Sequence, residues 1–297
     1  MIALVAILIT PASNTAAQAT APERRLKISP LRTELSITPG TAYMGTIRLE
    51  NTGTTPLYVE LSTEAFSVLG ENYDYTFDPS AKATEWVHFS SKTLEIEPEA
   101  VVPIKYVINV PLGTEPGGVY LSLFAASIPL AGSSIESTDR VGSLLYITVP
   151  GDITKDGSLV AFSSPFLGTS AVNWSATVRN AGSVHFNANY TTHLKSLWGS
   201  TVSEKAGDSL IMPRSVRLIQ DSQPEPAIMG LYLLSYKIGL GDNGTAIGTR
   251  AFLYLPVGQV SALLALVTAC ILFVSLGKDH RKQRNRRKQS KEKKTSD

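Results

Sequence analysis

The densest group of side chains able to bind a ligand lies in residues 69–85, LGENYDYTFDPSAKATE. Its aromatic and acidic residues are Glu71, Tyr73, Asp74, Tyr75, Phe77, Asp78 and Glu85. Aromatic rings stack on sugar faces, and carboxylates accept hydrogen bonds from sugar hydroxyls. The stretch is therefore a candidate glycan-binding loop, with Tyr73, Asp74, Tyr75 and Phe77 as its contacts. The alternative is a hairpin whose aromatic side chains cover the end of a β-sandwich.

Metal binding has weaker support in the sequence. Asp74 and Asp78 could contact Ca²⁺, but they lack the regular spacing of oxygen ligands found in calcium loops. His185 and His193 stand on one expected strand, roughly 26 Å apart, which is too far to share an ion. We therefore predict no metal and no cofactor. His185 is expected to face solvent, or to fix the turn after Gly182.

Catalytic motifs are absent from the sequence. There is no HExxH, no GxSxG and no P-loop, and His88, His185 and His193 are the histidines before the last forty residues. The protein is therefore expected not to be an enzyme. A wall hydrolase remains an alternative, and it would need two carboxylates within about 10 Å of each other in a cleft.

Several glycines and asparagines are expected to shape the backbone. Asn51 with Gly53, and Asn180 with Gly182, form the same Asn-x-Gly unit between apolar strands, about 130 residues apart. Both residue types tolerate positive φ, so tight turns are predicted at these positions. Gly117 and Gly118 follow Pro116 and are interpreted in the same way. Trp198, in Leu197-Trp198-Gly199, is a candidate exposed hairpin aromatic that contacts a partner.

The elements that position these residues are predicted to be short strands. Residues 102–110 alternate between apolar and polar side chains, and so do residues 172–179 and 184–190. Asp242-Asn243-Gly244 predicts a hairpin turn between the last two strands. The expected fold class is all-β, with two tandem immunoglobulin-like antiparallel sandwiches followed by one transmembrane helix.

A membrane anchor is predicted by the uncharged segment 257–276, VGQVSALLALVTACILFVSL, which is followed by lysines and arginines. A helix of about 20 residues crosses the hydrocarbon core, and basic residues mark the cytoplasmic side. The predicted organisation is a signal peptide (1–19), a first sandwich (24–152), a second sandwich (156–256), a transmembrane helix (257–277) and a cytoplasmic tail (278–297). The part before the helix is expected to lie outside the cell.

The charge is divided unevenly along the chain. Of the 27 basic and 25 acidic residues, ten and three respectively lie in the tail from Lys278 to Asp297. The segment before the helix is therefore acidic, which argues against nucleic acid as its partner. The single cysteine, Cys270, lies in the predicted anchor, so the sandwiches have no disulfide.

Several segments resemble the WxL-interacting proteins of Gram-positive and related bacteria. They are ISPLRTELSITPG (28–40), IRLENTGTTPLYV (47–59), Trp86, VPLGTEPGGVY (110–120), VRNAGSVHF (178–186) and LIMPRSVRL (210–218). The chain departs from the family's pattern at Arg214, where a glycine usually follows the proline. None of its three tryptophans begins a Trp-x-Leu motif, so the chain does not resemble that family's partners.

The resemblance implies that the first sandwich associates with peptidoglycan and that the second binds a surface protein. The expected function is thus a membrane-anchored surface-binding protein. The alternative is a chaperone-like assembly factor for surface appendages, which would recognise a donated strand at a free sheet edge.

Overall fold

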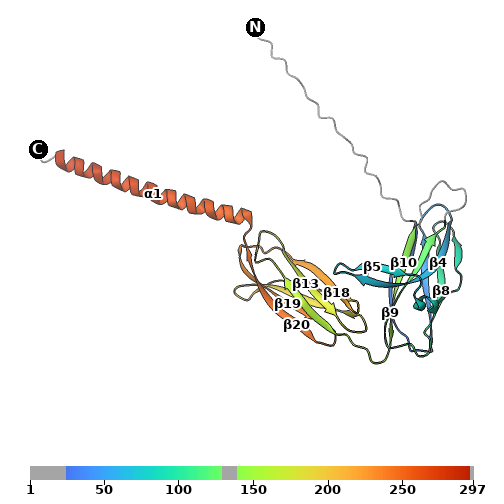
Figure 1. The fold of residues 1–297 in the computed structure, drawn as a ribbon. Coiled ribbons are helices and arrows are strands. Elements are labelled where there is room, and N and C mark those ends of the chain that lie inside the picture. The colour runs from blue at the N-terminus through green and yellow to red at the C-terminus, as the bar shows by residue number, and fades with distance from the viewer. Residues whose placement is uncertain (1–24, 129–138, 295–297) are drawn as a thin grey trace, which may run out of the picture.

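The computed structural model describes residues 25–128 and 139–294, with side chains described as far as residue 278 (Figure 1). The expected signal peptide lies outside the described residues. Ten strands and one short 3-10 helix form the first sandwich. They are β1 (Leu26–Ser29), β2 (Arg32–Ser36), β3 (Ala42–Asn51), β4 (Leu57–Leu69), β5 (Asp74–Asp78), η1 (Lys82–Trp86), β6 (Val87–Phe89), β7 (Thr93–Ile96), β8 (Val101–Asn109), β9 (Gly117–Ser127) and β10 (Arg140–Val149).

The second sandwich contains the next ten strands. They are β11 (Gly157–Ser163), β12 (Leu167–Gly168), β13 (Val172–Asn180), β14 (Phe186–Asn187), β15 (Tyr190–Ser196), β16 (Thr201–Gly207), β17 (Leu210–Ile211), β18 (Ser215–Gln223), β19 (Gly230–Gly239) and β20 (Thr245–Tyr254). The Asp242-Asn243-Gly244 turn joins β19 to β20, as predicted, with the Leu240 amide donating to the Gly244 carbonyl at 2.8 Å.

The order of the strands is that of immunoglobulin domains. In the first sandwich one sheet runs β1-β3-β8-β6 and the other runs β2-β10-β9-β4-β5, with β7 also paired to β4. In the second, β11-β13-β18 faces β12-β20-β19-β15-β16. These orders correspond to the two facing sheets of an immunoglobulin fold. The predicted fold class is therefore confirmed.

Alternation along the strands builds two separate cores. In the first sandwich Leu121, Leu123 and Ala125 of β9 are fully buried against Leu145 and Ile147 of β10. In the second, Trp174, Ala176 and Val178 of β13 are buried against residues of β19 and β20. The predicted strand at 102–110 is β8, and the one at 172–179 is β13.

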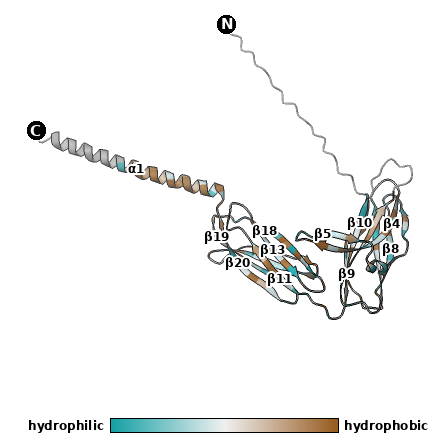
Figure 2. Ribbon diagram, in the orientation of Figure 1, coloured by the Kyte–Doolittle hydropathy of each residue, from teal (hydrophilic) through white to brown (hydrophobic). Residues whose placement is uncertain are grey.

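The helix α1 (Val257–Lys294) leaves the second sandwich at the end opposite the linker (Figure 1). Its first part, Val257–Lys278, is 22 residues long with a mean hydropathy of 2.5, and none of it is buried against the sandwiches. Figure 2 shows this apolar part next to the second sandwich. The segment is long and apolar enough to cross a membrane. Beyond it, the helical backbone continues through the basic segment.

Candidate binding site between the sandwiches

An aromatic band crosses the outer face of the β2-β10-β9-β4-β5 sheet. Glu34, Tyr146 and Tyr120 lie opposite one another on neighbouring strands, and Phe66 lies opposite Phe77. The rings of Tyr120 and Phe66 are 5.8 Å apart, which completes the row across five strands. Because successive side chains on a strand point to opposite faces, the alternation that buries Leu121 and Leu123 in the core sends Tyr120 outward.

The second sandwich covers most of this band. Leu210 and Met212 pack with Phe66, Tyr120 and Tyr146 in one buried cluster that is separate from the two sandwich cores. The cluster therefore joins the sandwiches, and a free outer face of a sheet becomes an apolar interface.

The β4–β5 hairpin reaches across to the second sandwich and ends there (Figure 1). The Leu218 amide of β18 donates to the Glu71 carbonyl at 2.9 Å. At the tip, Tyr73 has φ +64° and is buried, and its hydroxyl accepts a 2.7 Å hydrogen bond from the Met212 amide. The same hydroxyl lies 3.1 Å from the Ser215 hydroxyl. Arg217 lies over the ring, 4.3 Å from its centroid.

These contacts correct one part of the sequence-based expectation. The hairpin was expected to present Tyr73 to solvent as a sugar contact, but its ring lies between the sandwiches. A segment about 140 residues away in the sequence supplies its cover. The sequence of residues 69–85 does not indicate that a distant segment will bury Tyr73.

His185 lies beside the aromatic band and does not face solvent. Its side chain is 9% exposed, and its ring packs edge-on against Tyr120 and Tyr146, at 5.6 and 5.3 Å between centroids. The expectation of a solvent-facing histidine is therefore wrong. The side of residues 184–187 that carries His185 packs against the first sandwich, so the ring is covered.

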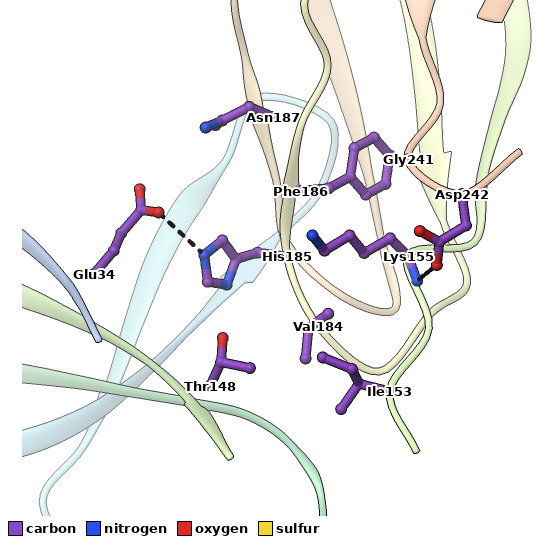
Figure 3. A pocket seen from close by; sticks show the side chains of 10 residues that line it. All are labelled: Glu34, Thr148, Ile153, Lys155, Val184, His185, Phe186, Asn187, Gly241 and Asp242. Atoms are coloured by element: carbon purple, nitrogen blue, oxygen red, sulfur yellow. Dashed lines mark hydrogen bonds and ion pairs between the residues drawn. The ribbon is translucent and has the colours of Figure 1, made fainter. Parts of the chain in front are cut away.

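Hydrogen bonds join His185 to Tyr120 of the first sandwich. The Tyr120 hydroxyl accepts from the His185 amide at 3.0 Å and lies 3.1 Å from Nδ1. The hydroxyl can donate its hydrogen to Nδ1 when the proton of the neutral ring is on Nε2, and this tautomer also turns the Nε2 hydrogen toward Glu34. Nε2 faces a Glu34 carboxylate oxygen at 3.8 Å (Figure 3), which is longer than a hydrogen bond.

Burial dominates the ionisation of this group. Loss of solvent lowers the pKa of His185, and the nearby Glu34 carboxylate works in the opposite direction. Burial also raises the pKa of Tyr120 and that of Tyr146. The Arg32 guanidinium lies over the ring of Tyr146, 4.7 Å from its centroid. The junction is therefore built from neutral rings, with its charges at the edge.

The linker between β10 and β11 is held closely against the second sandwich. The Ser183 amide donates to the Thr154 carbonyl at 2.9 Å, and the Lys155 amide donates to the Asp242 carboxylate at 2.8 Å. On the other side of the junction, the Gly118 amide donates to the Ser183 carbonyl at 3.0 Å. The second half of the linker is therefore bonded to the second sandwich, and β9 of the first sandwich is bonded directly to the same turn.

The two Asn-x-Gly units have the same buried structure. The side-chain oxygen of Asn180 accepts from the Gly182 amide at 2.9 Å, and its nitrogen donates to the Val184 and Ile211 carbonyls at 2.9 and 3.0 Å. The side-chain oxygen of Asn51 likewise accepts from the Gly53 amide at 2.9 Å. Both asparagines are fully buried. These are turns closed by the asparagine side chain.

The glycines of these units, Gly53 and Gly182, do not have the positive φ that was the expected reason for glycine there. A Cβ on Gly182 would lie 2.3 Å from the Thr154 carbonyl oxygen, so the position is required by the close approach of the linker. Gly117, with φ +152°, does have a backbone conformation that favours glycine.

Two clefts flank the junction. One, of about 470 Å³, is lined by polar groups that include Glu34, Lys155, His185 and Asp242 (Figure 3). The other, of about 590 Å³, lies between residues 66–69 and 115–120 of the first sandwich and residues 212–214 of the second.

Part of the expected sugar-binding loop remains open to solvent. Tyr75 and Phe77 are 44% and 39% exposed, and their rings are stacked 6.3 Å apart with an angle of 14° between planes. Asp74 is exposed. Asp78 accepts hydrogen bonds from the Ser80 amide and hydroxyl, which lower the pKa of its carboxyl. No group of three or more side chains able to hold a metal ion occurs in the described part of the chain.

Trp198 lies at the tip of the β15–β16 hairpin and is 90% exposed. The expected exposed aromatic is therefore present at the surface. It stands far from the junction, at the end of the second sandwich where α1 begins.

Comparisons with known proteins found distant structural likenesses and no family. No protein-family model matches the chain, and no curated protein matches it. Among solved structures, the chain is similar to the class 5 fimbriae chaperone CfaA, with a TM-score of 0.41, 11% identity, and coverage of 78% of this chain and 100% of that one.

Two further structures show the same kind of likeness. One is the CsuC–CsuE chaperone–tip adhesion subunit complex of Acinetobacter baumannii (TM-score 0.40, 13% identity, 77% of this chain and 99% of that one). The other is a PapD-like domain of human CEP192 (TM-score 0.33, 17% identity, 50% of this chain and 98% of that one). At these identities the likeness concerns the β-sandwich fold and no function.

Proposed function

We propose that the chain is a non-enzymatic surface-binding protein anchored in the cell membrane by α1. Its first sandwich binds cell-wall polymer, and its second binds a surface protein. The proposed topology leaves both sandwiches outside the cell and the basic end of the chain in the cytoplasm. The observation that carries wall binding is the stacked pair of Tyr75 and Phe77 on β5.

The pair has the properties of a platform for sugar rings. Phe66 of β4 lies beside both residues, with its centroid 5.7 Å from Tyr75 and 6.4 Å from Phe77. Phe77 also meets Phe124 edge-on at 5.0 Å. Rings held in this way lose little conformational entropy on binding, and two nearly parallel faces suit stacking on a glycan. Asp74 and Asp78, at the two ends of β5, can accept hydroxyl hydrogen bonds.

Sedimentation with insoluble peptidoglycan tests this proposal. Detergent-solubilised full-length protein should pellet with the polymer. The double variant Tyr75→Ala/Phe77→Ala should bind about 5- to 150-fold more weakly, since each of the two lost stacking contacts contributes about 0.5–1.5 kcal/mol. Met44→Ala is the matched control, because Met44 is an exposed apolar residue on the opposite sheet of the same sandwich. Equal binding by the double variant and the control would exclude the platform.

Partner binding by the second sandwich is supported by an open sheet edge. Among the described strands β16 pairs with β15 alone, and its residues are mostly exposed. An extended segment of another protein can add to such an edge through main-chain hydrogen bonds.

The same edge favours a second candidate, a chaperone-like assembly factor that holds subunits by their strands. Loss of the chain from living cells separates the two functions. An assembly factor is required for its subunits to accumulate, so their amount at the surface should fall. A surface-binding protein should leave that amount unchanged and alter only the attachment of its partner.

A further inference from the structure

Hydrogen bonds join the start of α1 to the end of the second sandwich from which the helix leaves. The Met229 amide donates to the side-chain oxygen of Gln259 at 2.7 Å, and the Gln259 side-chain nitrogen donates to the Ala227 carbonyl at 2.8 Å. Gln259 belongs to the first turn of α1, so the loop between β18 and β19 is held at the start of the helix.

Two other segments reach the same end. Ser196 of β15 lies opposite Tyr232, and Gly230 lies opposite Tyr254 at the end of β20, so the β15–β16 turn projects toward the level of the helix start. β12 runs parallel to β20, with Gly168 beside Tyr254.

These segments expose apolar side chains and carry almost no charge. The exposed residues are Phe166, Leu167, Leu197, Trp198, Ile228 and Val257. Residues 164–171, 197–200 and 224–229 contain one charged residue, Glu225. At the linker end of the same sandwich, the corresponding loops carry Asp152, Lys155, Asp156, Asp208, Arg214 and Asp242. The two ends of one domain therefore differ sharply in polarity.

We propose that this end of the second sandwich inserts its loops into the surface of the lipid bilayer, with Trp198 as the deepest aromatic contact. The inference rests on α1 crossing the membrane, as proposed above. Tryptophan prefers the boundary between headgroups and acyl chains, because its ring is apolar and its N–H is polar. The apolar loops lie at the end of the sandwich where the membrane helix starts, so they lie close to the level at which the helix enters the bilayer.

The turn of the β15–β16 hairpin, which carries Trp198, is ordered by its own backbone hydrogen bonds. The Ser196 amide donates to the Ser200 carbonyl, and the Gly199 amide donates to the Ser196 carbonyl, each at 2.9 Å. Gly199 has φ +84°, which closes the turn in a conformation that favours glycine. A turn that is already ordered inserts with little further loss of entropy. The contact holds the second sandwich at a fixed tilt on the membrane.

Fluorescence quenching by brominated lipid tests the proposal. Full-length protein is reconstituted in phosphatidylcholine vesicles with or without bromine on the acyl chains. Trp174 is in a sandwich core and Trp86 is in the distal sandwich, so only Trp198 lies within reach of the bromine. We expect the brominated vesicles to remove the Trp198 share of the emission, and the Trp198→Phe variant to show no loss.

A displaced tryptophan supplies the control. The double variant Trp198→Phe/Met44→Trp carries an exposed tryptophan on the first sandwich, away from the bilayer, and its emission should be the same in both kinds of vesicle. Equal emission of the unmodified protein in both vesicles, with Trp198 quenched by aqueous iodide, would overturn lipid contact and leave the tip as a contact for a protein. Failure of the protein to float with vesicles in alkaline carbonate would overturn the membrane span as well.

Discussion

His185 ties the two sandwiches together in its uncharged form. Protonation of Nδ1 would deprive the Tyr120 hydroxyl hydrogen of its acceptor. Burial lowers the pKa of the folded imidazole below 6.5, so the unfolded chain takes up the proton first as the pH falls. The contribution of His185 to stability is therefore complete above pH 6.5 and is lost as the pH falls toward its lowered pKa.

We expect His185→Asn to remove this pH dependence. The asparagine oxygen can accept the Tyr120 hydroxyl in place of Nδ1, and it does not titrate. Urea unfolding between about pH 7.5 and about pH 5.5 measures the effect. His193→Asn is the control, because the His193 side chain is 33% exposed. An equal acid-induced loss of stability in the original protein and in His185→Asn would show that another group titrates.

Asn180 is a fully buried polar side chain of the second sandwich that makes three hydrogen bonds. We expect Asn180→Ala to lower the free energy of unfolding by about 2–4 kcal/mol, because it leaves the Gly182 amide and two buried carbonyls without partners. Trp174, in the same core, reports the transition in urea. The exposed Asn189→Ala is the control, and a loss no larger than this control's would contradict the assignment.

At the scale of elements, the β4–β5 hairpin is a strut between the sandwiches. We expect Tyr73→Phe to weaken its docking by about 1–3 kcal/mol, because the buried Met212 amide loses its acceptor. Limited proteolysis should then cut residues 70–74 faster. Tyr106→Phe removes a hydroxyl from the first sandwich without reaching the second, and it should leave the rate unchanged. Equal cutting rates for both variants would refute docking through the Tyr73 hydroxyl.

Alternation of side chains predicted β8 and β13 correctly, but the expected strand at 184–190 consists only of β14 and the first residue of β15. The pattern of residues 102–110 predicts β8 because one face of that strand meets a core made by the same sandwich. The same pattern fails for His185 and Tyr73, whose outward side chains are covered by a different sandwich. Period-two alternation distinguishes the two faces of a strand, but it contains no information on which distant segment packs on the outer face. Expected exposure was therefore wrong at the junction and right at Trp198.

The glycines illustrate the same limit. Asn-x-Gly predicts a turn at residues 180–182 from local chemistry alone, and the turn is present. The reason for Gly182 is the linker carbonyl beside it, which a local pattern cannot reveal. The interface as a whole is thus a property of the folded chain: the aromatic band, the hairpin tip and the linker come from segments separated by tens to more than a hundred residues.

At the scale of the whole molecule, we expect these contacts to hold the two sandwiches as one rigid body. Spin labels at Met44→Cys and Ile247→Cys, placed on exposed positions of the two sandwiches in a Cys270→Ser background, should give a single narrow distance distribution by double electron–electron resonance. A hinge would give a broad distribution, because the linker alone does not restrict the angle.

The interface between the sandwiches should become more mobile when the linker is displaced and the docking of the β4–β5 hairpin is weakened in the same variant. A Cβ in Gly182→Ala would lie 2.3 Å from the Thr154 carbonyl oxygen and 2.7 Å from the Asp156 amide nitrogen, both of them backbone atoms, so the linker must shift. We expect Gly182→Ala/Tyr73→Phe to broaden the distance distribution. Gly230→Ala/Tyr106→Phe is the matched control, because a Cβ on Gly230 meets its nearest neighbour only at 3.8 Å. A broad distribution in the original protein would contradict rigidity, and an unchanged narrow one in Gly182→Ala/Tyr73→Phe would show that the aromatic band alone fixes the angle.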